Sequence, residues 1–243
     1  MGFVVKKTTK YSWLDVVCPP FCMGCGRLGS IICECCKKDM KRICKLKEKW
    51  WLDKDCSVKS VSAIKKDDSN PTNDANEYCD WNGLWAVGER KGLLDELIKR
   101  YKYDSSRNIS GVMAGLIADV IPFLDEKVVI VPLPTIRKHI RERGFDHTLV
   151  LAKKLARMRG WKYEIVLARK GKAVQVGANM EQRKVQAREA YEVVGKIDEK
   201  KSYVLLDDVL TTGASMCAGL ELMRRAGAKK VYGAVMGVSF NDD

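Results

Sequence analysis

YVLLDDVLTTGAS, residues 203–215, is the stretch of this chain from which the fold can be predicted most directly. It opens with an apolar run, 203–206, that has no polar alternation, which is typical of a strand buried on both faces of a parallel sheet. Downstream, Met216, Leu220 and Met223 have the spacing of one face of a helix. The stretch therefore predicts a strand, a turn and a helix of an α/β fold.

Two carboxylates and a turn of small residues stand between this strand and this helix. Asp207 and Asp208 come where the strand is predicted to end, and ligands of open α/β sheets bind at the carboxyl ends of strands. The turn can hold a phosphate, because it offers unpaired N–H groups and the positive end of the helix dipole. Acids that bind vicinal hydroxyls beside a phosphate cradle indicate a sugar-phosphate site. The residues of the cradle are Thr211, Thr212, Gly213, Ala214 and Ser215.

Residues 204–215 resemble the phosphoribosyl pyrophosphate (PRPP) motif of type I phosphoribosyltransferases. The chain from about residue 13 to residue 240 resembles the ComF family, whose members carry a cysteine-rich segment before such a domain. The resemblance implies a parallel sheet flanked by helices, and binding of PRPP, or of another ribose 5-phosphate ligand, with Mg²⁺. It also implies that Asp207 and Asp208 are the catalytic acids and that residues 211–215 contact PRPP. A strand–turn–helix that carries the same letters without a ligand is the alternative.

Other segments resemble the same families and imply contacts with the diphosphate. Lys102 belongs to a Lys-Tyr pair similar to one in the ComF family, which implies a cation close to the pyrophosphate. The turn around residues 133–138 resembles the pyrophosphate loop of the transferases, and Arg137 in it can donate two hydrogen bonds at once to a diphosphate. The family pattern Arg-Gly-Phe-Asn-Gln ends in this chain with Asp146 and His147.

Residues 169–183 lack periodicity and predict a mobile loop of the kind that closes over a reactive sugar and excludes water. The segment that follows, 183–191, resembles the ComF pattern Arg-x-x-Asn-Val-x-x-Ala-Phe, with Gln186 and Tyr191 as variants. This resemblance implies that Arg183 is a further PRPP contact.

Nine of the ten cysteines lie in the front third of the chain. Cys22 and Cys25 form a C-x2-C pair, and Cys33 and Cys36 form a second pair, with Cys35 as a competitor for either place. The paired spacing resembles the zinc-binding knuckles of the ComF family. It predicts a structural Zn²⁺ on Cys22, Cys25, Cys33 and Cys36, because four thiolates leave no open position on the metal. Free thiols in a reducing compartment are the alternative.

The overall composition predicts a cytoplasmic protein with phosphate-rich partners. The longest apolar runs fall well short of the roughly 20 residues that a transmembrane helix needs, and the first ten residues do not read as a signal peptide. The net charge of +13 favours nucleic acid, anionic membrane or a polyphosphorylated small molecule, although a solvated basic face would give the same value.

Residues 37–66 concentrate this charge, with eleven basic and four acidic residues. Trp50 and Trp51 stand among them, and cations interleaved with aromatic rings are typical of single-stranded nucleic-acid binding. Packing of the two tryptophans against the rest of the chain is the alternative. The roles of the remaining front cysteines stay open, and a second metal site is a weak alternative for the last three of them: Cys18, Cys44, Cys56 and Cys79.

Composition divides the chain into two predicted domains. Residues 13–80 form a cysteine-rich zinc-binding domain whose end, 65–76, reads as a loop or linker, and residues 81–243 form an α/β domain. Strand–helix alternation in the second domain predicts a parallel sheet flanked by helices. The predicted strands cover 81–87, 128–133, 163–168, 203–206 and 231–238, and the predicted helices cover 92–103, about 113–121 and 147–158.

Two functions of different classes remain open at this point, and a purely regulatory PRPP-responsive protein is a third possibility that uses the same residues. In the first, the protein is a phosphoribosyltransferase that moves the sugar of PRPP to an acceptor, with Mg²⁺ and arginines neutralising the leaving diphosphate. In the second, suggested by the ComF resemblance, it binds single-stranded DNA and competence proteins during natural transformation, and its PRPP site is a sensor or a relic. The acceptor pocket, which the sequence does not define, distinguishes the two.

Overall fold

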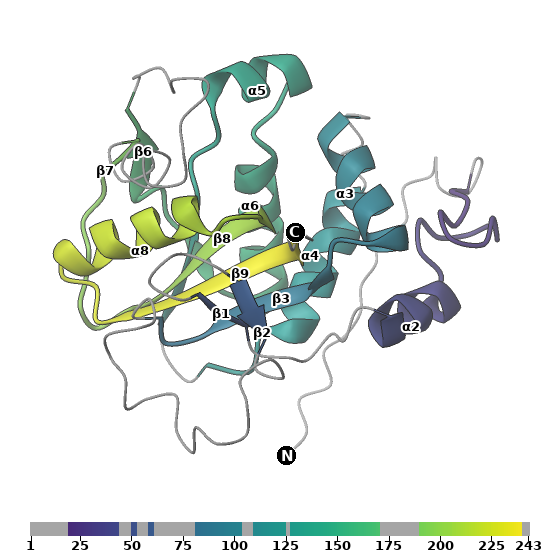
Figure 1. Cartoon of the computed structure of the whole chain (residues 1–243), viewed down its shortest axis with the longest axis horizontal. Coiled ribbons are helices and arrows are strands. Elements are labelled where there is room, and N and C mark those ends of the chain that lie inside the picture. The colour runs from purple at the N-terminus through teal and green to yellow at the C-terminus, as the bar shows by residue number, and fades with distance from the viewer. Residues whose placement is uncertain are drawn as a thin grey trace.

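The computed structural model describes residues 19–43, 50–52, 58–60, 81–103, 109–124, 127–170 and 190–239. Its centre is a five-stranded sheet with the order β3-β9-β8-β4-β5, in which all neighbours are parallel (Figure 1). The middle strand β8 is buried almost throughout, as its apolar sequence predicts. The strands are β3 (Leu84–Glu89), β9 (Lys230–Val238), β8 (Ser202–Leu210), β4 (Val128–Pro132) and β5 (Lys162–Tyr163).

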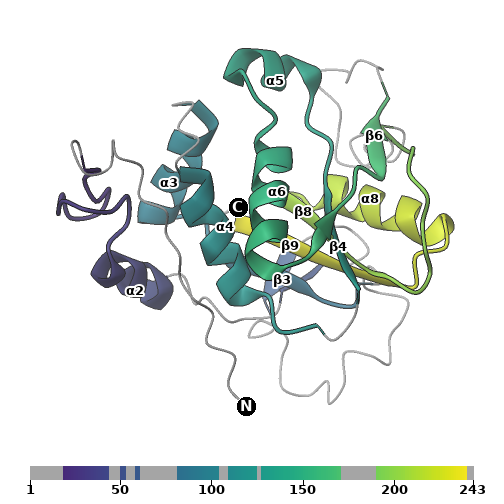
Figure 2. The ribbon, with the colours of Figure 1, turned by 180° about the vertical axis from the view of Figure 1, so that it is seen from behind.

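Helices cover both faces of this sheet, which confirms the predicted α/β class. On one face α3 (Gly92–Tyr103), α4 (Ile109–Val120) and α6 (His147–Arg159) share a hydrophobic core with the strands (Figure 2). On the other face α8 (Ala214–Arg225) packs against the strands in a second core (Figure 1). The inward residues of α8 include those predicted from their spacing, Met216, Leu220 and Met223.

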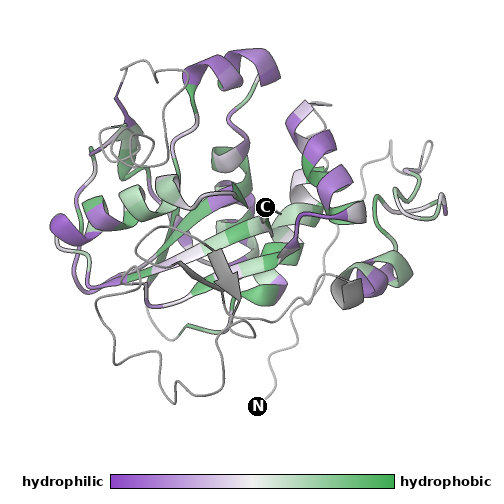
Figure 3. Ribbon diagram, viewed as in Figure 1, coloured by the Kyte–Doolittle hydropathy of each residue, from purple (hydrophilic) through white to green (hydrophobic). Residues whose placement is uncertain are grey.

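Two smaller sheets and two further helices complete the described part of the chain. Strand β6 (Leu167–Arg169) pairs antiparallel with β7 (Tyr191–Val193), and β1 (Trp50–Leu52) pairs antiparallel with β2 (Val58–Ser60). Helix α5 (Arg137–Arg143) has no buried residue and is predominantly hydrophilic (Figure 3). Helix α2 (Glu34–Ile43) begins directly after Cys33 and contains Cys36, the second member of that pair.

Most predicted elements occur with shifted ends. The helix predicted over 92–103 is found at those residues, and the helix predicted over 147–158 extends by one residue, to Arg159. The segment 163–168 is not one strand, because β5 ends in the main sheet and β6 belongs to the small sheet with β7. The central strand β8 continues to Leu210, four residues past the predicted end, because Val209 and Leu210 still pair with Gly237 and Val238 of β9.

The cysteine-rich segment packs directly on the helices of the main sheet. Ile32 and Met40 belong to the same hydrophobic core as α3, α4 and α6, and Lys37 forms an ion pair with Asp119 of α4 at 3.1 Å. Figure 2 shows α2 lying beside α3 and α4. Where the structure is described, no helix has the length and apolar character needed to cross a bilayer.

Close packing between α8 and the sheet gives a testable prediction about Gly219. A Cβ atom at Gly219 would lie 2.8 Å from Leu205 Cδ2, whereas a Cβ at Gly115 in α4 would meet no atom within 4 Å. Gly115→Ala should raise the free energy of unfolding by about 1 kcal/mol through helix propensity. The free energy of unfolding of Gly219→Ala should be about 1 to 3 kcal/mol lower than that of Gly115→Ala because of overpacking. Urea unfolding of both variants measures the difference, and equal stabilisation of the two would contradict it.

Candidate functional site

A cavity of about 210 Å³ opens where the carboxyl ends of β4 and β8 meet. The backbone N–H of Leu133 donates to the Leu206 carbonyl at 2.9 Å, so the loop after β4 begins beside Asp207. This is the edge of a parallel sheet at which ligands bind. The cavity is lined by Lys102, Leu133, Pro134, Thr135, Ile136, His139, Arg143, His147, Arg169, Tyr191, Asp207, Asp208 and Ser215.

The two acids reach this cavity from opposite faces of β8. Successive side chains of a strand alternate between faces. Val204 and Leu206 lie in the core on the α3 side, and Tyr203 and Leu205 lie in the core on the α8 side. Asp208 therefore follows the first set, and Asp207 follows the second. The sequence predicts the acids as one pair after the strand, whereas the strand runs through both of them and gives them different neighbours.

Asp208 is buried, with 6% of its surface exposed, and lies between two basic side chains. Its Oδ2 atom is 2.9 Å from Lys102 Nζ of α3 and 2.8 Å from His147 Nε2 of α6. Both contacts are short without being well-directed hydrogen bonds: the contact with Lys102 is an ion pair, and the contact with His147 places a ring nitrogen against the carboxylate. Lys102, predicted from the Lys-Tyr resemblance, is thus a lining residue of the cavity.

The two acids differ in the direction of their pKa shifts as well as in their contacts. Burial alone would raise the pKa of Asp208, but His147 and Lys102 together hold that pKa well below its usual range. For Asp207, burial and the neighbouring charge of Asp208 both raise the pKa, although the backbone N–H of Asp208 donates to Asp207 Oδ1 at 2.8 Å. The side chain of Asp207 keeps partial exposure toward the cavity. Asp208 is therefore the charged anchor, and Asp207 is the acid that remains partly exposed at the cavity.

The phosphate cradle predicted at residues 211–215 is the start of α8. Gly213 has a φ of 77° and makes no side-chain cap hydrogen bond. A helix start without a capping side chain leaves N–H groups that an anion can accept from. Within the turn, Thr212 Oγ1 accepts a 3.4 Å contact from the Ala214 N–H. Ser215 lines the cavity, whereas Thr211 and Thr212 are exposed and lie outside its lining.

The described part of the structure places neither of the two predicted arginines in the cavity. Arg137 is exposed at the start of α5 and is not one of the lining residues. His139 and Arg143, further along the same helix, line the cavity instead. Arg183 and most of the loop predicted over 169–183 lie outside the described residues. The PRPP contacts of both arginines stay predictions.

Asp146 and His147, which depart from the family pattern, have separate roles in the structure. Asp146 is the N-cap of α6, where its Oδ1 accepts from the Leu149 N–H at 3.1 Å and from Thr135 Oγ1 at 3.1 Å. His147 is 5% exposed and contacts Asp208. An Asp directly before a helical apolar pattern is a signal in the sequence from which this cap can be predicted.

The side of the cavity next to α8 is built by Arg169 and Tyr191, which are paired between β6 and β7. The Arg169 guanidinium donates to the Tyr191 hydroxyl at 3.1 Å and its Cζ lies 5.3 Å from the centre of the Tyr191 ring. Burial raises the pKa of Tyr191. In the sequence, Tyr191 stands where the family pattern has phenylalanine. Its pairing with Arg169 could not be predicted locally, because residues 170–190 separate the two partners.

The four predicted metal ligands come together away from this cavity. The Sγ atoms of Cys22, Cys25, Cys33 and Cys36 all lie within 4.8 Å of one another, and no other such group of ligands occurs in the described parts of the chain. Tetrahedral Zn²⁺ with bonds of about 2.3 Å requires sulfur atoms about 3.8 Å apart. The sulfurs of Cys25 and Cys33 are 3.6 Å apart. The four cysteines are therefore positioned for a metal ion and fit Zn²⁺.

Backbone donors favour the thiolate form of Cys22 and Cys33, whereas the neighbouring sulfurs raise the pKa of Cys36. The N–H of Cys33 points to Cys22 Sγ at 3.3 Å, and the N–H of Cys36 points to Cys33 Sγ at 3.5 Å. Burial raises the pKa of Cys22, but the donor from Cys33 and its neighbours outweigh burial and lower that pKa to about 6. Cys35 is exposed and is not a member of the cluster. This resolves which of the close cysteines face one another.

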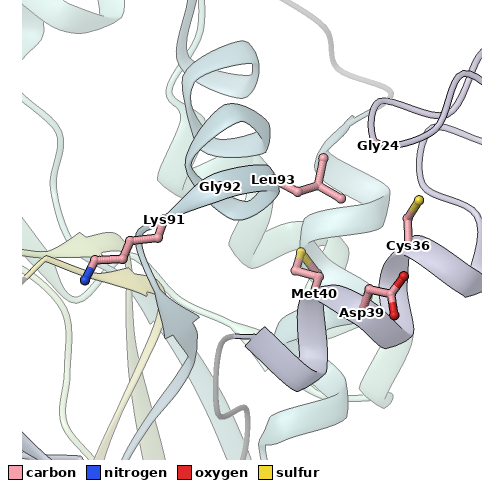
Figure 4. A pocket seen from close by; sticks show the side chains of 7 residues that line it. All are labelled: Gly24, Cys36, Asp39, Met40, Lys91, Gly92 and Leu93. Atoms are coloured by element: carbon pink, nitrogen blue, oxygen red, sulfur yellow. The ribbon is translucent and has the colours of Figure 1, made fainter.

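A second cavity, of about 230 Å³, lies between the metal-site segment and the start of α3 (Figure 4). A Cβ at Gly24 would lie 2.8 Å from Cys36 Sγ and 3.1 Å from Leu93 Cδ2. Only a glycine permits this approach. The turn between Cys22 and Cys25 therefore contacts both Cys36, a predicted metal ligand, and Leu93 in the first turn of α3.

Comparisons with protein-family models and with curated proteins found no match for this chain. Among solved structures, it is similar to an allosteric regulatory enzyme of purine biosynthesis, with 18% identity, 57% of this chain and 30% of that chain covered, and a TM-score of 0.40. It is also similar to a glutamine PRPP amidotransferase from B. subtilis, with 19% identity, 56% and 30% covered, and a TM-score of 0.39.

A third similar structure is an adenine phosphoribosyl transferase from Trypanosoma brucei, with 14% identity, 64% of this chain and 83% of that chain covered, and a TM-score of 0.40. The matched part spans 30% of the length of each of the first two enzymes. At these identities and TM-scores, the function of the chain has to be argued from its own residues.

The metal site gives a prediction with a matched control. Cys22→Ser should abolish binding of about one zinc per chain and lower the melting temperature, because metal-binding energy contributes to folding of this segment. Cys35→Ser should change neither the zinc content nor the melting temperature, although Cys35 lies two positions after Cys33 and one before Cys36. Metal analysis and thermal melts with and without a chelator measure both effects. A metal-free wild-type protein, or equal losses in the two variants, would sink the assignment.

Proposed function

We propose that the cavity at the ends of β4 and β8 binds PRPP, or another ribose 5-phosphate ligand, with Mg²⁺. The observation that carries the proposal is that Asp207 and Asp208 share one cavity with Ser215 at the start of α8 and with cations from three other elements. Acids for ribose hydroxyls, a helix start for the 5-phosphate and cations for a diphosphate are thus in reach of one ligand. The resemblance of residues 204–215 to the PRPP motif supports the same ligand.

The protein groups divide this ligand among them. Ser215 and the N–H groups of the first turn of α8 hold the 5-phosphate at the positive end of the helix dipole. Asp207, which the cavity exposes, accepts hydrogen bonds from the ribose hydroxyls. The Arg143 and Lys102 cations face the diphosphate, where planar and point charges neutralise the leaving group.

Mg²⁺ fits this site only as a partner of the ligand. The two acids and a further acid or histidine do not form a metal-binding group of three in the described ranges, since the four cysteines make the sole group of that kind there. Mg²⁺ usually keeps several waters and is held by one or two carboxylates and substrate phosphates. We infer that Asp207 supplies a protein oxygen and that the diphosphate of PRPP supplies the remaining anionic ligands.

If the site is catalytic, the reaction is transfer of the 5-phosphoribosyl group to an acceptor with loss of pyrophosphate. The C1–O bond to the diphosphate breaks, and charge develops on the leaving diphosphate and at C1 of the sugar. Positioning and electrostatic stabilisation supply such catalysis without a covalent nucleophile. The chain would then be a cytoplasmic member of the ComF family, in which the four cysteines hold Zn²⁺.

A second candidate function is binding of single-stranded nucleic acid in DNA uptake, with competence proteins as partners. Arg137, Lys138 and Arg141 are exposed on α5, the helix that also contributes to the cavity, and this favours a polyanion near the site. The basic residues 37–66 are described only in part, and no side chain of Trp50 or Trp51 is described. In this function PRPP would regulate the protein.

The two functions predict different responses to changes on α5. Replacing Lys138 and Arg141 together by Ala should weaken oligonucleotide binding and reduce its salt dependence, because fewer counterions are released. PRPP binding should change little, since neither residue lines the cavity. Fluorescence anisotropy across a salt series measures the first effect. An unchanged salt slope would contradict nucleic-acid binding by α5.

The PRPP site is tested by replacing its acids. Asp207→Asn should lower the affinity for PRPP with Mg²⁺ about tenfold to hundredfold, which is the loss of a hydrogen bond to a charged group. Asp208→Asn should lower affinity and also stability, because Lys102 loses a buried partner. Glu192→Gln is the matched control, since it removes an exposed carboxylate of β7 next to Tyr191 in sequence. Isothermal titration and pyrophosphate release against amines, nucleobases and oligonucleotides provide the readouts.

The same titrations include the outcome that would reject the site. No binding of PRPP or ribose 5-phosphate by the wild-type protein at millimolar concentration with Mg²⁺ would do so, as would an Asp207→Asn, Asp208→Asn double variant that binds like wild type. Gly213→Val should weaken ribose 5-phosphate as well as PRPP, because a side chain at a φ of 77° disturbs the backbone that faces the phosphate.

A further inference from the structure

The chain contains two histidines, and both line the cavity. His139 comes from the hydrophilic helix α5 and is half-buried, whereas His147 opens α6 and is 5% exposed. Only His147 touches one of the two acids. A buried polar ring with close partners on both nitrogens is a built feature of a site, because unpaired polar groups are costly to bury.

The partners of His147 determine which ring nitrogen carries the hydrogen. Nε2 lies 2.8 Å from Asp208 Oδ2, and a charged carboxylate only accepts hydrogen bonds. Arg143 NH1 lies 2.9 Å from Nδ1 and 3.3 Å from Nε2, and a guanidinium only donates. The arrangement is consistent when Nε2 carries the hydrogen, in close contact with the Asp208 carboxylate, and Nδ1 accepts from Arg143. We assign this tautomer from the partners.

The backbone around His147 fixes the position of the ring. Its carbonyl accepts a 2.6 Å hydrogen bond from the buried Tyr101 hydroxyl, and Tyr101 precedes Lys102 on α3. The residue before His147, Asp146, caps α6 through the Leu149 N–H. The end of α3 and the start of α6 are thus tied together at the point where Lys102 and His147 both meet Asp208.

From this geometry we propose that His147 is a positioning residue of the phosphoribosyl site, which holds the Asp208 carboxylate against Lys102 so that the acid and the cation are in place before a ribose 5-phosphate ligand arrives. The proposal rests on the proposed function for its ligand, but not for the contact itself. It divides the two acids: Asp207 meets the ligand, and Asp208 holds two basic side chains at the cavity wall. Preorganisation of this kind saves the ordering cost of binding.

Affinity measurements test the role of the contact. His147→Leu should weaken binding of ribose 5-phosphate and of PRPP with Mg²⁺ about tenfold or more, because it removes the donor to a charged group. His147→Gln should restore most of this loss, since its amide N–H₂ can take the place of Nε2–H. In an Asp208→Asn background, His147→Leu should cost much less. A ring that only fills space would show neither the rescue nor the non-additivity.

A second measurement needs no ligand. With only two histidines in the chain, ¹⁵N-histidine labelling gives two imidazoles in an NMR spectrum, and a His139→Gln variant assigns them. The Nε2–H signal of His147 should be visible and slow to exchange in the wild-type protein, and it should be lost or exchange fast in Asp208→Ala. Circular dichroism confirms that each variant is folded.

The outcomes separate this proposal from the proposed function. If the wild-type protein binds neither ligand but the protected Nε2–H signal is present and depends on Asp208, the function is wrong and the contact is right. If the protein binds both ligands while His147→Leu binds like wild type, or if the Nε2–H signal is absent or insensitive to Asp208→Ala, the positioning role of His147 is overturned.

Discussion

The charge on Asp208 is the constraint on which the arrangement of the site depends. A carboxylate that is 6% exposed needs compensating partners, because desolvation of an unpaired charge is costly. The partners, Lys102 and His147, come from the end of α3 and the start of α6, and each lies within 2.9 Å. The strand end and the two helix ends are thus held at one point. The cavity has its shape because these three elements meet there.

Asp207, the second acid of the strand, lacks the basic partners that Asp208 has. Asp207 lies on the other face of β8, and its environment raises its pKa, whereas that of Asp208 is lowered. Two adjacent residues of identical chemistry therefore differ in charge behaviour because strand alternation gives them different neighbours. A ligand with hydroxyl groups and a bound cation would supply to Asp207 what Lys102 and His147 supply to Asp208.

Local sequence patterns predicted the parallel sheet, the spans of its main helices and the four clustered cysteines. These features depend on periodicity and on short spacings, which a single segment carries. The contact of His147 with Asp208 spans 61 positions, and the pairing of Arg169 with Tyr191 joins two short strands, so neither could be read locally. The guanidinium of Arg137 favours it as a diphosphate contact, but residue type alone does not tell which way the side chain points. A helix turns successive residues to different sides, and here His139 and Arg143 face the cavity instead.

Helix α3 connects the two candidate sites of the molecule. Its first turn, at Leu93, approaches Gly24 in the cysteine-rich segment, and its last turn carries Lys102. Its 12 residues make a stiff rod about 18 Å long. Two contacts fix the positions of the ends of α3: the packing of Leu93 against Gly24 at its start, and the ion pair of Lys102 with Asp208 at its end. An insertion or deletion of one residue would rotate one end by about 100° relative to the other, so the length of this helix should tolerate less evolutionary change than its exposed side chains.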